Sequence, residues 1–307
     1  MNNLGNGGAN DLSFLCSLKN ATYLHSLDIN FNNFGGDLPK CIGNLSTTLT
    51  SILLDNNMIS GKIPIEIGNL INLERLDMWK NKLSGDIPFE IGKLQKLQIL
   101  ALQTNNLYGN IPSSIGNLTL MIELYLSENN LQGNIPLSLS KCQNLFDLNL
   151  ANNNLSGSLS PQIIGLSFSP TFLDLSTNRF TGVLSMEVGN WINLEELDVS
   201  ENVFFGKIPV SLGSCVKLEI LAMRGNLFQG IIPPSLESLR GLEKLDLSNN
   251  NLSSQIPKFL EIFIYLQVLN LSYNQFEGEV PIDGVFMNTS ATFVKGNGKL
   301  CGGIPEF

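Results

Sequence analysis

The amino-acid sequence offers few of the side chains that catalysis requires. Its one histidine, His25, lies in a segment without the sharp nucleophile turn of a Ser–His–Asp site. No glycine-rich loop precedes a Lys-Ser or Lys-Thr pair, and no group of residues has the spacing of metal ligands. We therefore expect an exposed His25, no catalytic residues, no metal site and no cofactor.

The five cysteines are an odd number and include no C-x-x-C pair, so neither zinc nor redox spacing is present. Cys142 and Cys215 stand in equivalent phrases, SKCQNL and GSCVKL, and we expect both to be buried free thiols. Cys16 and Cys41 lie 25 residues apart and could pair. Two unpaired thiols are nevertheless the favoured interpretation.

Composition excludes several classes of protein. Hydrophobic residues make up 43% of the 307 residues, which is enough to bury a large core. The formal net charge of −9 argues against binding to a phosphate backbone, so we expect no nucleic-acid partner. No apolar stretch approaches the roughly 20 residues of a membrane helix. We expect no membrane insertion by this segment, and residues 1–11 lack the apolar core of a secretory signal.

One phrase recurs along the chain: L-x-x-L-x-L-x-x-N-x-L-x-G-x-I-P. Its asparagine stands at positions 32, 57, 81, 105, 129, 153, 178, 202, 226, 250 and 274, in steps of 24 or 25 residues. Such a period indicates a solenoid, in which each repeat buries its apolar face against its neighbours. We assign 24–281 to eleven leucine-rich repeats, 1–23 to a truncated repeat or incomplete N-terminal cap, and 282–307 to an incomplete C-terminal cap.

Each position of the phrase has a physical task. The alternating leucines of L-x-L point to one face of a short strand, and stacked strands form one parallel sheet. The asparagine amide can bond backbone groups that would otherwise be buried without partners, which predicts an asparagine ladder. The expected fold is a right-handed α/β-type superhelix with a concave parallel sheet and an irregular or 3-10 convex side. Ser160 and Ser185 replace the proline of repeats six and seven, where we expect the convex side to be least regular.

The L-x-G-x-I-P tail is similar to the plant-specific class of leucine-rich repeat, over essentially the whole chain. Three phrases narrow the resemblance: DLSFLCSLKNATYL at 11–24, FGGDLPKCIGNLSTTL at 34–49, and FEGEVPIDGVFMNTSATFVKGNGKLCGG at 276–303. Together they resemble the ectodomain of a plant leucine-rich repeat receptor-like serine/threonine kinase. The subfamily they resemble is that of plant immune receptors for bacterial elicitors.

The resemblance implies a sensor on the extracellular face of the plasma membrane, with any kinase domain outside this chain. It implies a peptide or protein ligand, and a co-receptor kinase that contacts the C-terminal repeats near Tyr273 and Phe276. It also implies that Cys301, in KLCGG, pairs with a further cysteine a few residues on, which this chain does not contain.

Binding specificity is expected at the x positions of L-x-x-L-x-L-x-x-N, because these side chains vary and point out from the sheet in columns. Aromatic side chains beside charges of both signs are typical of binding hot spots, and repeats three to six carry this combination. The predicted ligand-binding residues are Arg75, Asp77, Trp79, Lys80, Gln103, Thr104, Glu123, Tyr125, Glu128, Phe146, Asp147 and Asn149. The alternative is a scattered, solvated face.

A second, acidic surface is expected on repeats eight to ten, where it would attract a basic partner. It comprises Glu195, Glu196, Asp198, Glu201, Glu219, Glu243 and Asp246, with Arg224 and Lys244 among them. Several of the aspartates belong to the phrases LDLS and LDVS, which recur as part of the repeat. Support of the backbone and solubility is therefore the favoured interpretation of those aspartates.

Triplets of the form N-x-S/T are acceptors for N-linked glycans on secreted proteins. The predicted glycosylation sites are Asn20, Asn44, Asn117, Asn154, Asn251 and Asn288. Asn270 stands in such a triplet too, but it lies between two core leucines of a strand, so we do not include it. Together the triplets favour a secreted glycoprotein.

Two alternatives to a receptor ectodomain stay open. One is a secreted binding protein of the polygalacturonase-inhibitor type, and the other is a truncated receptor without function. The gene downstream of Phe307 would distinguish them: a membrane helix and kinase motifs indicate the receptor, and a stop codon after one more cysteine indicates the inhibitor.

Overall fold

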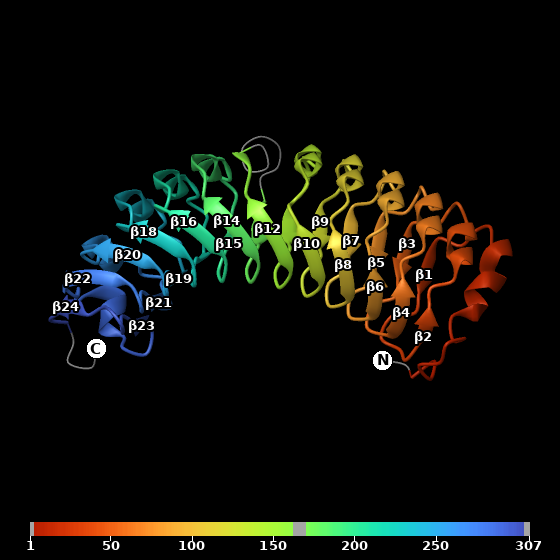
Figure 1. The fold of residues 1–307 in the computed structure, drawn as a ribbon, viewed down its shortest axis with the longest axis horizontal. Helices are drawn as coiled ribbons and strands as arrows, with labels where there is room; N and C mark the ends of the chain where they lie inside the picture. Colours follow the sequence, from red (N-terminus) through yellow and green to blue (C-terminus); the bar gives the residue numbers. More distant parts are fainter. Residues whose placement is uncertain (1–2, 162–169, 304–307) are drawn as a thin grey trace. The chain divides into compact units, whose positions relative to one another are not determined.

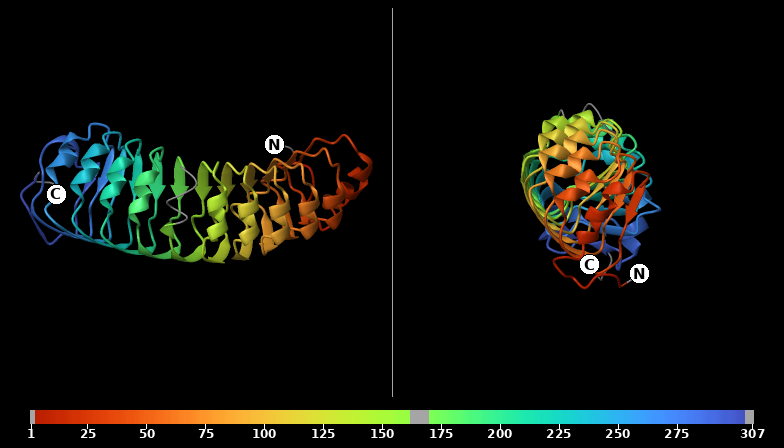
Figure 2. Two further views of the ribbon diagram at one scale, coloured as in Figure 1. Left: turned by 90° about the horizontal axis from the view of Figure 1, so that it is seen from above. Right: turned by 90° about the vertical axis from the view of Figure 1, so that its right-hand side faces the viewer.

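The computed structural model describes residues 3–161 and 170–303, and the chain divides into two compact units between Leu155 and Ser156. Each repeat contributes, in order, a short strand to a first sheet, a second strand to another sheet, and a 3-10 helix. Figures 1 and 2 show the helices along one side of each unit and the first-sheet strands along another.

Unit 1 contains the first six repeats. Its first sheet has the order β1 (Ser26–Asp28), β3 (Ser51–Leu53), β5 (Arg75–Asp77), β7 (Ile99–Ala101), β9 (Glu123–Tyr125), β11 (Asp147–Asn149). Its second sheet has the order β2 (Gly35–Asp37), β4 (Met58–Lys62), β6 (Lys82–Gly85), β8 (Asn106–Asn110), β10 (Asn130–Gly133), β12 (Asn154–Ser158). Its 3-10 helices are η1 (Ser13–Asn20), η2 (Lys40–Asn44), η3 (Ile65–Asn69), η4 (Phe89–Lys93), η5 (Ser113–Asn117) and η6 (Leu137–Lys141).

Unit 2 repeats this arrangement. Its first sheet has the order β13 (Phe172–Asp174), β15 (Glu196–Asp198), β17 (Ile220–Ala222), β19 (Lys244–Asp246), β21 (Val268–Asn270), β23 (Thr292–Phe293). Its second sheet has the order β14 (Arg179–Val183), β16 (Val203–Gly206), β18 (Leu227–Gly230), β20 (Asn251–Ser254), β22 (Gln275–Glu279), β24 (Lys299–Cys301). Its described 3-10 helices are η7 (Met186–Asn190), η8 (Val210–Ser214), η9 (Pro234–Ser238), η10 (Lys258–Ile262) and η11 (Gly284–Met287).

The first sheet confirms the strand predicted from L-x-L. Leu76 of β5 and Leu100 of β7 are Cα partners in a parallel ladder, and both side chains are fully buried. The residues on either side of each buried leucine point to the opposite face. Spacing of 24 or 25 residues keeps the leucines in register, so one continuous apolar layer forms inside each unit.

The second sheet was not anticipated. The N-x-L-x-G segment is extended, and the same segment of the next repeat lies beside it, so backbone groups pair across repeats. Leu83 of β6 is the Cα partner of Gly61 on β4, and Gly85 pairs with Leu107 on β8. The pairing uses backbone atoms, which is why the side-chain pattern did not reveal it.

Proline begins most of the 3-10 helices. In repeat three, Pro88 caps η4 at φ −67°, and its carbonyl accepts a hydrogen bond from the amide of Ile91 at 3.0 Å. In repeat seven, Ser185 takes this place at φ −70°, and its hydroxyl accepts from the amide of Glu187. The expectation that the convex side of repeat seven is irregular is therefore wrong. For repeat six, most of the turn after Ser160 lies outside the described residues.

The asparagine ladder is present in both units. Asn105 donates from Nδ2 to the carbonyls of Met78, Leu102 and Gln103 at 3.0–3.3 Å, and its Oδ1 accepts from the amide of Leu83 at 2.9 Å. The same set of bonds recurs at Asn57, Asn81, Asn129, Asn153, Asn202, Asn226, Asn250 and Asn274. Each amide thus joins two neighbouring repeats, as the sequence predicted.

A disulfide joins Cys16 of η1 to Cys41 of η2, with the two Cα atoms 5.4 Å apart. The favoured expectation of two free thiols was wrong. Helices of adjacent repeats stack side by side, so residues one repeat apart on the helical side come into bonding range. Cys142 and Cys215 are buried free thiols, as predicted, and burial raises the pKa of each to about 11.

The C-terminal segment continues the repeat arrangement after residue 282. β23 pairs with β21, and β24 pairs with β22. Asn297 takes the ladder role: its Oδ1 accepts from the amide of Phe276 at 3.1 Å, and its Nδ2 donates to Leu271 and Val294. This segment therefore covers the last full repeat with backbone pairing of the same kind.

Candidate functional site

The outward surface of the first sheet, here called the strand face, carries the residues that the sequence analysis proposed as ligand-binding. In each repeat, two strand residues and the two residues after the second buried leucine point outward. The residue before the ladder asparagine has a positive φ, as at Lys80 (54°), Thr104 (57°) and Glu128 (54°). The left-handed conformation turns the chain off the sheet and displays these side chains at its edge.

In repeat three, Arg75 and Asp77 form an ion pair across β5, with Nη2 and Oδ2 3.0 Å apart. Asp77 was expected to be displayed on the surface, but it is only 4% exposed. Its position is outward, but the half-exposed Arg75 pairs with its Oδ2 atom. Burial raises the pKa of Asp77, and its hydrogen bond and charge pairing with Arg75 oppose the rise.

Trp79 is half-buried rather than exposed, because it packs against a ring two repeats away. Its indole meets the ring of Phe31 edge-on, with centroids 6.2 Å apart. Between these repeats lies Asp55, which is 3% exposed. Burial raises the pKa of Asp55, and the charge of Asp77 adds to the rise.

Phe31 and Asp55 were not predicted to be part of the site. The repeat pattern could have indicated them, because both stand at outward positions between a strand and its ladder asparagine, as Trp79 does. Neither residue is unusual within its own repeat, so only the stacking of repeats one to three shows that they form a group with Asp77.

Repeats five and six bring a second group of predicted residues together. The phenol of Tyr125 donates to Oδ2 of Asp147 at 2.8 Å. Burial raises the pKa of Tyr125, and the hydrogen bond to Asp147 and the charges of Asp147 and Glu123 add to the rise. Phe146 is 49% exposed, beside this pair in sequence. The strands of this group present a phenol and two carboxylates on one surface, and an exposed aromatic ring directly precedes β11.

The other predicted residues lie on the same face. Among the described residues, no hydrogen bond or ion pair links them to either group. Thr104 donates to Glu128 at 3.1 Å. Asn149 accepts a hydrogen bond from the backbone amide of Ala151 and so supports the end of its strand. Lys80 is exposed, and Gln103 is half-buried.

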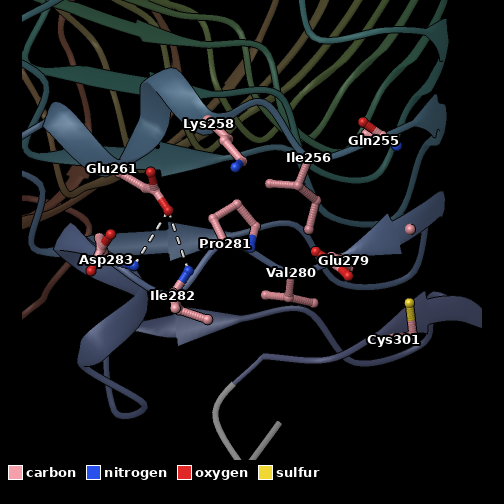
Figure 3. A pocket seen from close by; sticks show the side chains of 11 residues that line it. Gln255, Ile256, Lys258, Glu261, Glu279, Val280, Pro281, Ile282, Asp283 and Cys301 are labelled. Atoms are coloured by element: carbon pink, nitrogen blue, oxygen red, sulfur yellow. Dashed lines mark hydrogen bonds between the residues drawn. The ribbon is translucent and has the colours of Figure 1, made fainter.

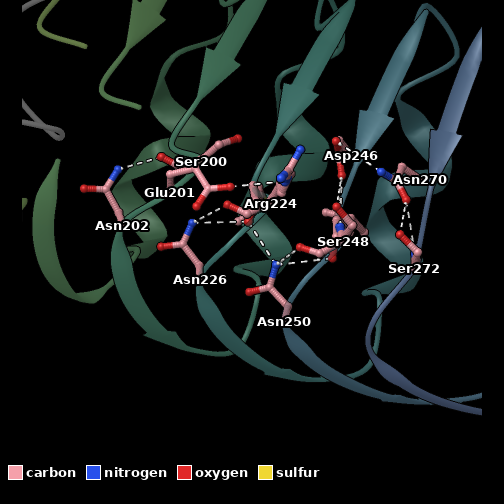
Figure 4. Close-up of polar contacts among 12 residues, drawn as sticks. Ser200, Glu201, Asn202, Arg224, Asn226, Asp246, Ser248, Asn250, Asn270 and Ser272 are labelled. Carbon is pink, nitrogen blue, oxygen red and sulfur yellow. Dashed lines mark hydrogen bonds and ion pairs between the residues drawn. The ribbon is translucent and has the colours of Figure 1, made fainter. Parts of the chain in front are cut away.

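The acidic surface of unit 2 divides into two kinds of residue. Asp198 and Asp246 accept hydrogen bonds from the amides of Ser200 and Ser248, two residues on, at 2.8 and 3.0 Å. Figure 4 shows Asp246 with Ser248, and the ion pair of Glu201 with Arg224 beside the ladder. These aspartates support the backbone, which was the favoured interpretation.

Three glutamates of this surface line a small hollow. It has a volume of about 130 Å³ and is lined by Thr171, Phe172, Glu195, Glu196, Glu219 and Ile220. Burial raises the pKa of Glu196, and the charges of Asp174 and Asp198 add to it. The hollow is shallow and has a single sign of charge.

The predicted co-receptor contact at Phe276 is wrong, and the contact at Tyr273 stays a prediction. Tyr273 is 53% exposed, but Phe276 is fully buried. Phe276 occupies the leucine position of N-x-L, and its equivalents Phe180, Phe204 and Phe228 stack in the core with centroids 6.2 and 6.3 Å apart. The repeat pattern itself assigned this position to the core, so the error could have been avoided.

All six predicted glycan acceptors are exposed, whereas Asn270 is half-buried and its Oδ1 accepts from Ser272. His25 is exposed, with Nδ1 3.1 Å from the carbonyl oxygen of Thr48. A hollow of about 640 Å³ lies beside β22 and β24. Figure 3 shows Glu261 there, where its carboxylate accepts from the amides of Ile282 and Asp283. Cys301 stands exposed at its rim.

Within residues 3–161 and 170–303, no three or more His, Cys, Asp or Glu side chains are arranged to hold a metal ion. None of the helices in those ranges combines the length and apolar character that crossing a membrane requires.

The Leucine Rich Repeat family model matches this chain at nine places, which together cover more than half of it. They are residues 23–45, 48–70, 72–94, 96–118, 121–142, 193–215, 217–239, 241–262 and 265–284. The chain is also 49% identical, over 77 residues, to the LRR receptor-like serine/threonine-protein kinase EFR of Arabidopsis thaliana. That match covers 25% of this chain and 8% of EFR.

Solved structures of plant receptors resemble the fold. The ectodomain of the Arabidopsis thaliana receptor kinase GASSHO1/SCHENGEN3, in complex with CASPARIAN STRIP INTEGRITY FACTOR 2, gives a TM-score of 0.86 at 36% identity. That match covers 94% of this chain and 34% of the receptor chain. The Arabidopsis receptor kinase HAESA, in complex with the peptide hormone IDA and the co-receptor SERK1, gives a TM-score of 0.54 at 29% identity, over 95% of this chain and 64% of that one. These similarities are to ligand-binding portions of receptors.

Proposed function

The chain belongs to the leucine-rich repeat family, and from that premise we propose that it is the ligand-sensing portion of a plant receptor-like kinase. Its strand face binds a peptide or protein ligand. The observation that carries the proposal is the group on repeats five and six, where the phenol of Tyr125 donates to Asp147 on the adjacent strand and the exposed Phe146 directly precedes that strand. Buried leucines in register and the asparagine ladder hold this group rigid, so little ordering is needed when a ligand binds.

The chemistry of this group suits a protein partner better than a small molecule. Aromatic side chains with a polar handle supply large contact area, and the carboxylates next to them add directional hydrogen bonds. The surface is open rather than concave around one ligand, since the hollow described on the strand face of unit 2 has only about 130 Å³. An extended segment lying across several strands would contact these columns in turn.

The disulfide supports an extracellular location. Structural disulfides persist in oxidising compartments, and Cys16–Cys41 joins two adjacent repeats of unit 1. The six exposed N-x-S/T asparagines agree with that compartment. We place the chain on the outer face of the plasma membrane, as part of a receptor whose kinase domain lies outside this chain.

Two similar solved structures support the type of ligand. GASSHO1/SCHENGEN3 was solved with CASPARIAN STRIP INTEGRITY FACTOR 2, and HAESA with a peptide hormone and a co-receptor. For this chain, a co-receptor kinase would contact the exposed Tyr273, and the buried Phe276 takes no part. Tyr273→Ala should weaken association of the receptor with the co-receptor ectodomain, whereas Tyr265→Ala, an exposed tyrosine of the same repeat, should not.

A random peptide library selected against the chain tests the proposal. Affinities of the selected peptides would be measured for the wild type, Tyr125→Ala and Phe146→Ala. Phe89→Ala is the matched control, because Phe89 is 62% exposed on the helical side. We expect the strand-face variants to lose about tenfold or more in affinity, and the control to lose nothing. Peptides that bind all three variants as tightly as the wild type, or that lose affinity only with Phe89→Ala, would overturn the proposal.

A further inference from the structure

One carboxylate oxygen on the strand face of unit 1 has no hydrogen-bond donor. Asp77 is 4% exposed, its Oδ2 pairs with Arg75, and its Oδ1 is buried without a partner. At the same position in unit 2, the Oδ1 atoms of Asp174 and Asp198 accept from the backbone amide two residues on, at 2.9 and 2.8 Å. At Asp77 the corresponding amide is that of Trp79. This amide lowers the pKa of the carboxyl group, but it is not placed to make a full hydrogen bond to Oδ1.

Nearby on the same face, a second hydrogen-bond acceptor has no donor. Gln103, at the end of the strand next to β5, has a buried Oε1 without a partner. The buried partnerless oxygens of Glu66, Ser114, Ser211 and Ser235 all lie in 3-10 helices instead. Among the described strand-face residues, such acceptors are therefore confined to repeats three and four.

The local charge is negative and poorly compensated. Asp55 and Asp77 are both nearly fully buried, and the charge of Asp77 raises the pKa of Asp55. The charge of Asp28 also raises the pKa of Asp55. Against these three carboxylates stand Arg75, which pairs with Asp77, and the exposed Lys80. An unpaired buried carboxylate costs free energy that a bound cation would relieve.

Two aromatic rings meet on the same face, and one of them, Trp79, stands two residues after Asp77 at an outward position of the same repeat. Trp79 meets Phe31 edge-on at 6.2 Å, and the two residues come from the repeats on either side of the one that carries Asp55. A cation over an indole face is attracted by the ring quadrupole, most strongly where water is excluded. Carboxylate oxygens and an indole face together are the surroundings that suit a guanidinium or an ammonium group.

We propose that Asp55, Asp77 and Trp79 form a binding site for a basic group of the ligand, a guanidinium or an ammonium. The inference rests on the proposed ligand-binding role of the strand face and names one chemical feature of the ligand. The incoming group donates to Oδ1 of Asp77 and packs on the indole of Trp79. Arg75 is a half-exposed side chain, and it rotates aside to admit the group. Competition from Arg75 and Lys80 keeps the affinity of an isolated basic group low.

A pair of small probes isolates the charge. Acetyl-arginine amide and acetyl-citrulline amide have the same shape, but only the first carries a positive charge. Trp79 reports their binding by fluorescence, because Trp191, the other of the two tryptophans, is buried in the core. At matched ionic strength we expect the arginine probe to saturate in the millimolar range and the citrulline probe to bind about tenfold more weakly.

Matched variants locate the site. Asp77→Asn should lower the affinity for the arginine probe by about tenfold. Asp198→Asn alters the same position of another repeat, where Oδ1 already has a donor, and should change nothing. Asp55→Asn is a second test, should circular dichroism show that Asp77→Asn is misfolded. Equal binding of the two probes, no binding, an equal loss in Asp198→Asn, or the same saturating signal from calcium chloride would each overturn the inference.

The outcomes separate this inference from the proposed function. If the arginine probe fails while library peptides still lose affinity in Tyr125→Ala, the basic-group site is rejected and the ligand-binding face is retained. If the affinity of the library peptides is also unchanged in the strand-face variants, both the basic-group site and the proposed function are rejected.

Discussion

The side-chain oxygen of Asn129 accepts a hydrogen bond from the backbone amide of Leu107, in the preceding repeat, at 2.9 Å. The amide nitrogen of the same side chain donates to the carbonyls of Leu102, Leu126 and Ser127. One side chain thus satisfies four buried backbone groups in two repeats. Similar bonds at the other ladder positions make the asparagines the polar counterpart of the leucine core.

Asn129→Ala should destabilise the chain by roughly 3 kcal/mol, because the amide of Leu107 and the carbonyls stay buried without partners. Urea unfolding followed by circular dichroism measures the change. Asn130→Ala is the matched control, since Asn130 is the exposed next residue. Equal unfolding midpoints of the two variants would contradict the ladder role.

Ser254→Gly should stabilise the chain by about 1 kcal/mol. Ser254 takes the repeat position that is glycine in ten of eleven repeats, and it has φ 77°, a conformation that strains a residue with a Cβ. Ser253→Gly provides the control, because its neighbouring position is extended and glycine there should destabilise. Thermal unfolding compares the two, and a lower midpoint for Ser254→Gly would contradict the expectation.

Replacing both Cys16 and Cys41 by serine should lower the free energy of unfolding by about 3 kcal/mol, because the bridge closes a loop of about one repeat in the unfolded chain. Cys301→Ser, at an exposed free thiol, should leave stability unchanged. Both effects can be measured by chemical unfolding. A double variant as stable as the wild type would show that the bridge does not hold η1 on η2.

Asp174→Asn should stabilise the chain at neutral pH by about 0.5 kcal/mol, since Asp198 is its Cα partner on the next strand and repels it. Asparagine keeps the turn bond to Ser176, as Asn270 does with Ser272.

The gain should depend on pH. Burial raises the pKa of Asp174 in the folded chain, so the folded state binds the proton first as pH falls. The penalty is present at neutral pH and disappears as pH falls through the raised pKa. Unfolding midpoints of the variant and the wild type should therefore converge in acid. A difference that stays constant from neutral to acid pH would contradict this.

How far the binding face could be predicted depends on the residue. Tyr125 and Asp147 were found because each stands at an outward strand position, and repeat spacing places such positions side by side. Asp77 was found by the same rule but expected on the surface. Its burial depends on how Arg75 and Trp79 pack around it, and no pattern of residue types contains that information. Phe31 and Asp55 joined the group only when three repeats were stacked.

The errors have different physical origins. Phe276 was placed on the surface although the N-x-L pattern assigns its position to the core, so the rule was available and not applied. The Cys16–Cys41 bridge needed two helices side by side, which a separation of 25 residues allows but does not require. The second sheet needed backbone pairing between equal segments, and side-chain identity carries little information about it.

The sequence by itself determined the repeat unit, its strand, its proline-capped turn and its asparagine ladder. These follow from bonds and packing between residues at constant spacing, which repeat without change along the chain. Only the tertiary structure decided which outward side chains are exposed, which carboxylates are left without donors, and which cysteines meet. Those properties depend on contacts among different side chains of neighbouring repeats. Each repeat supplies its own residues at these positions, so a periodic pattern cannot specify them.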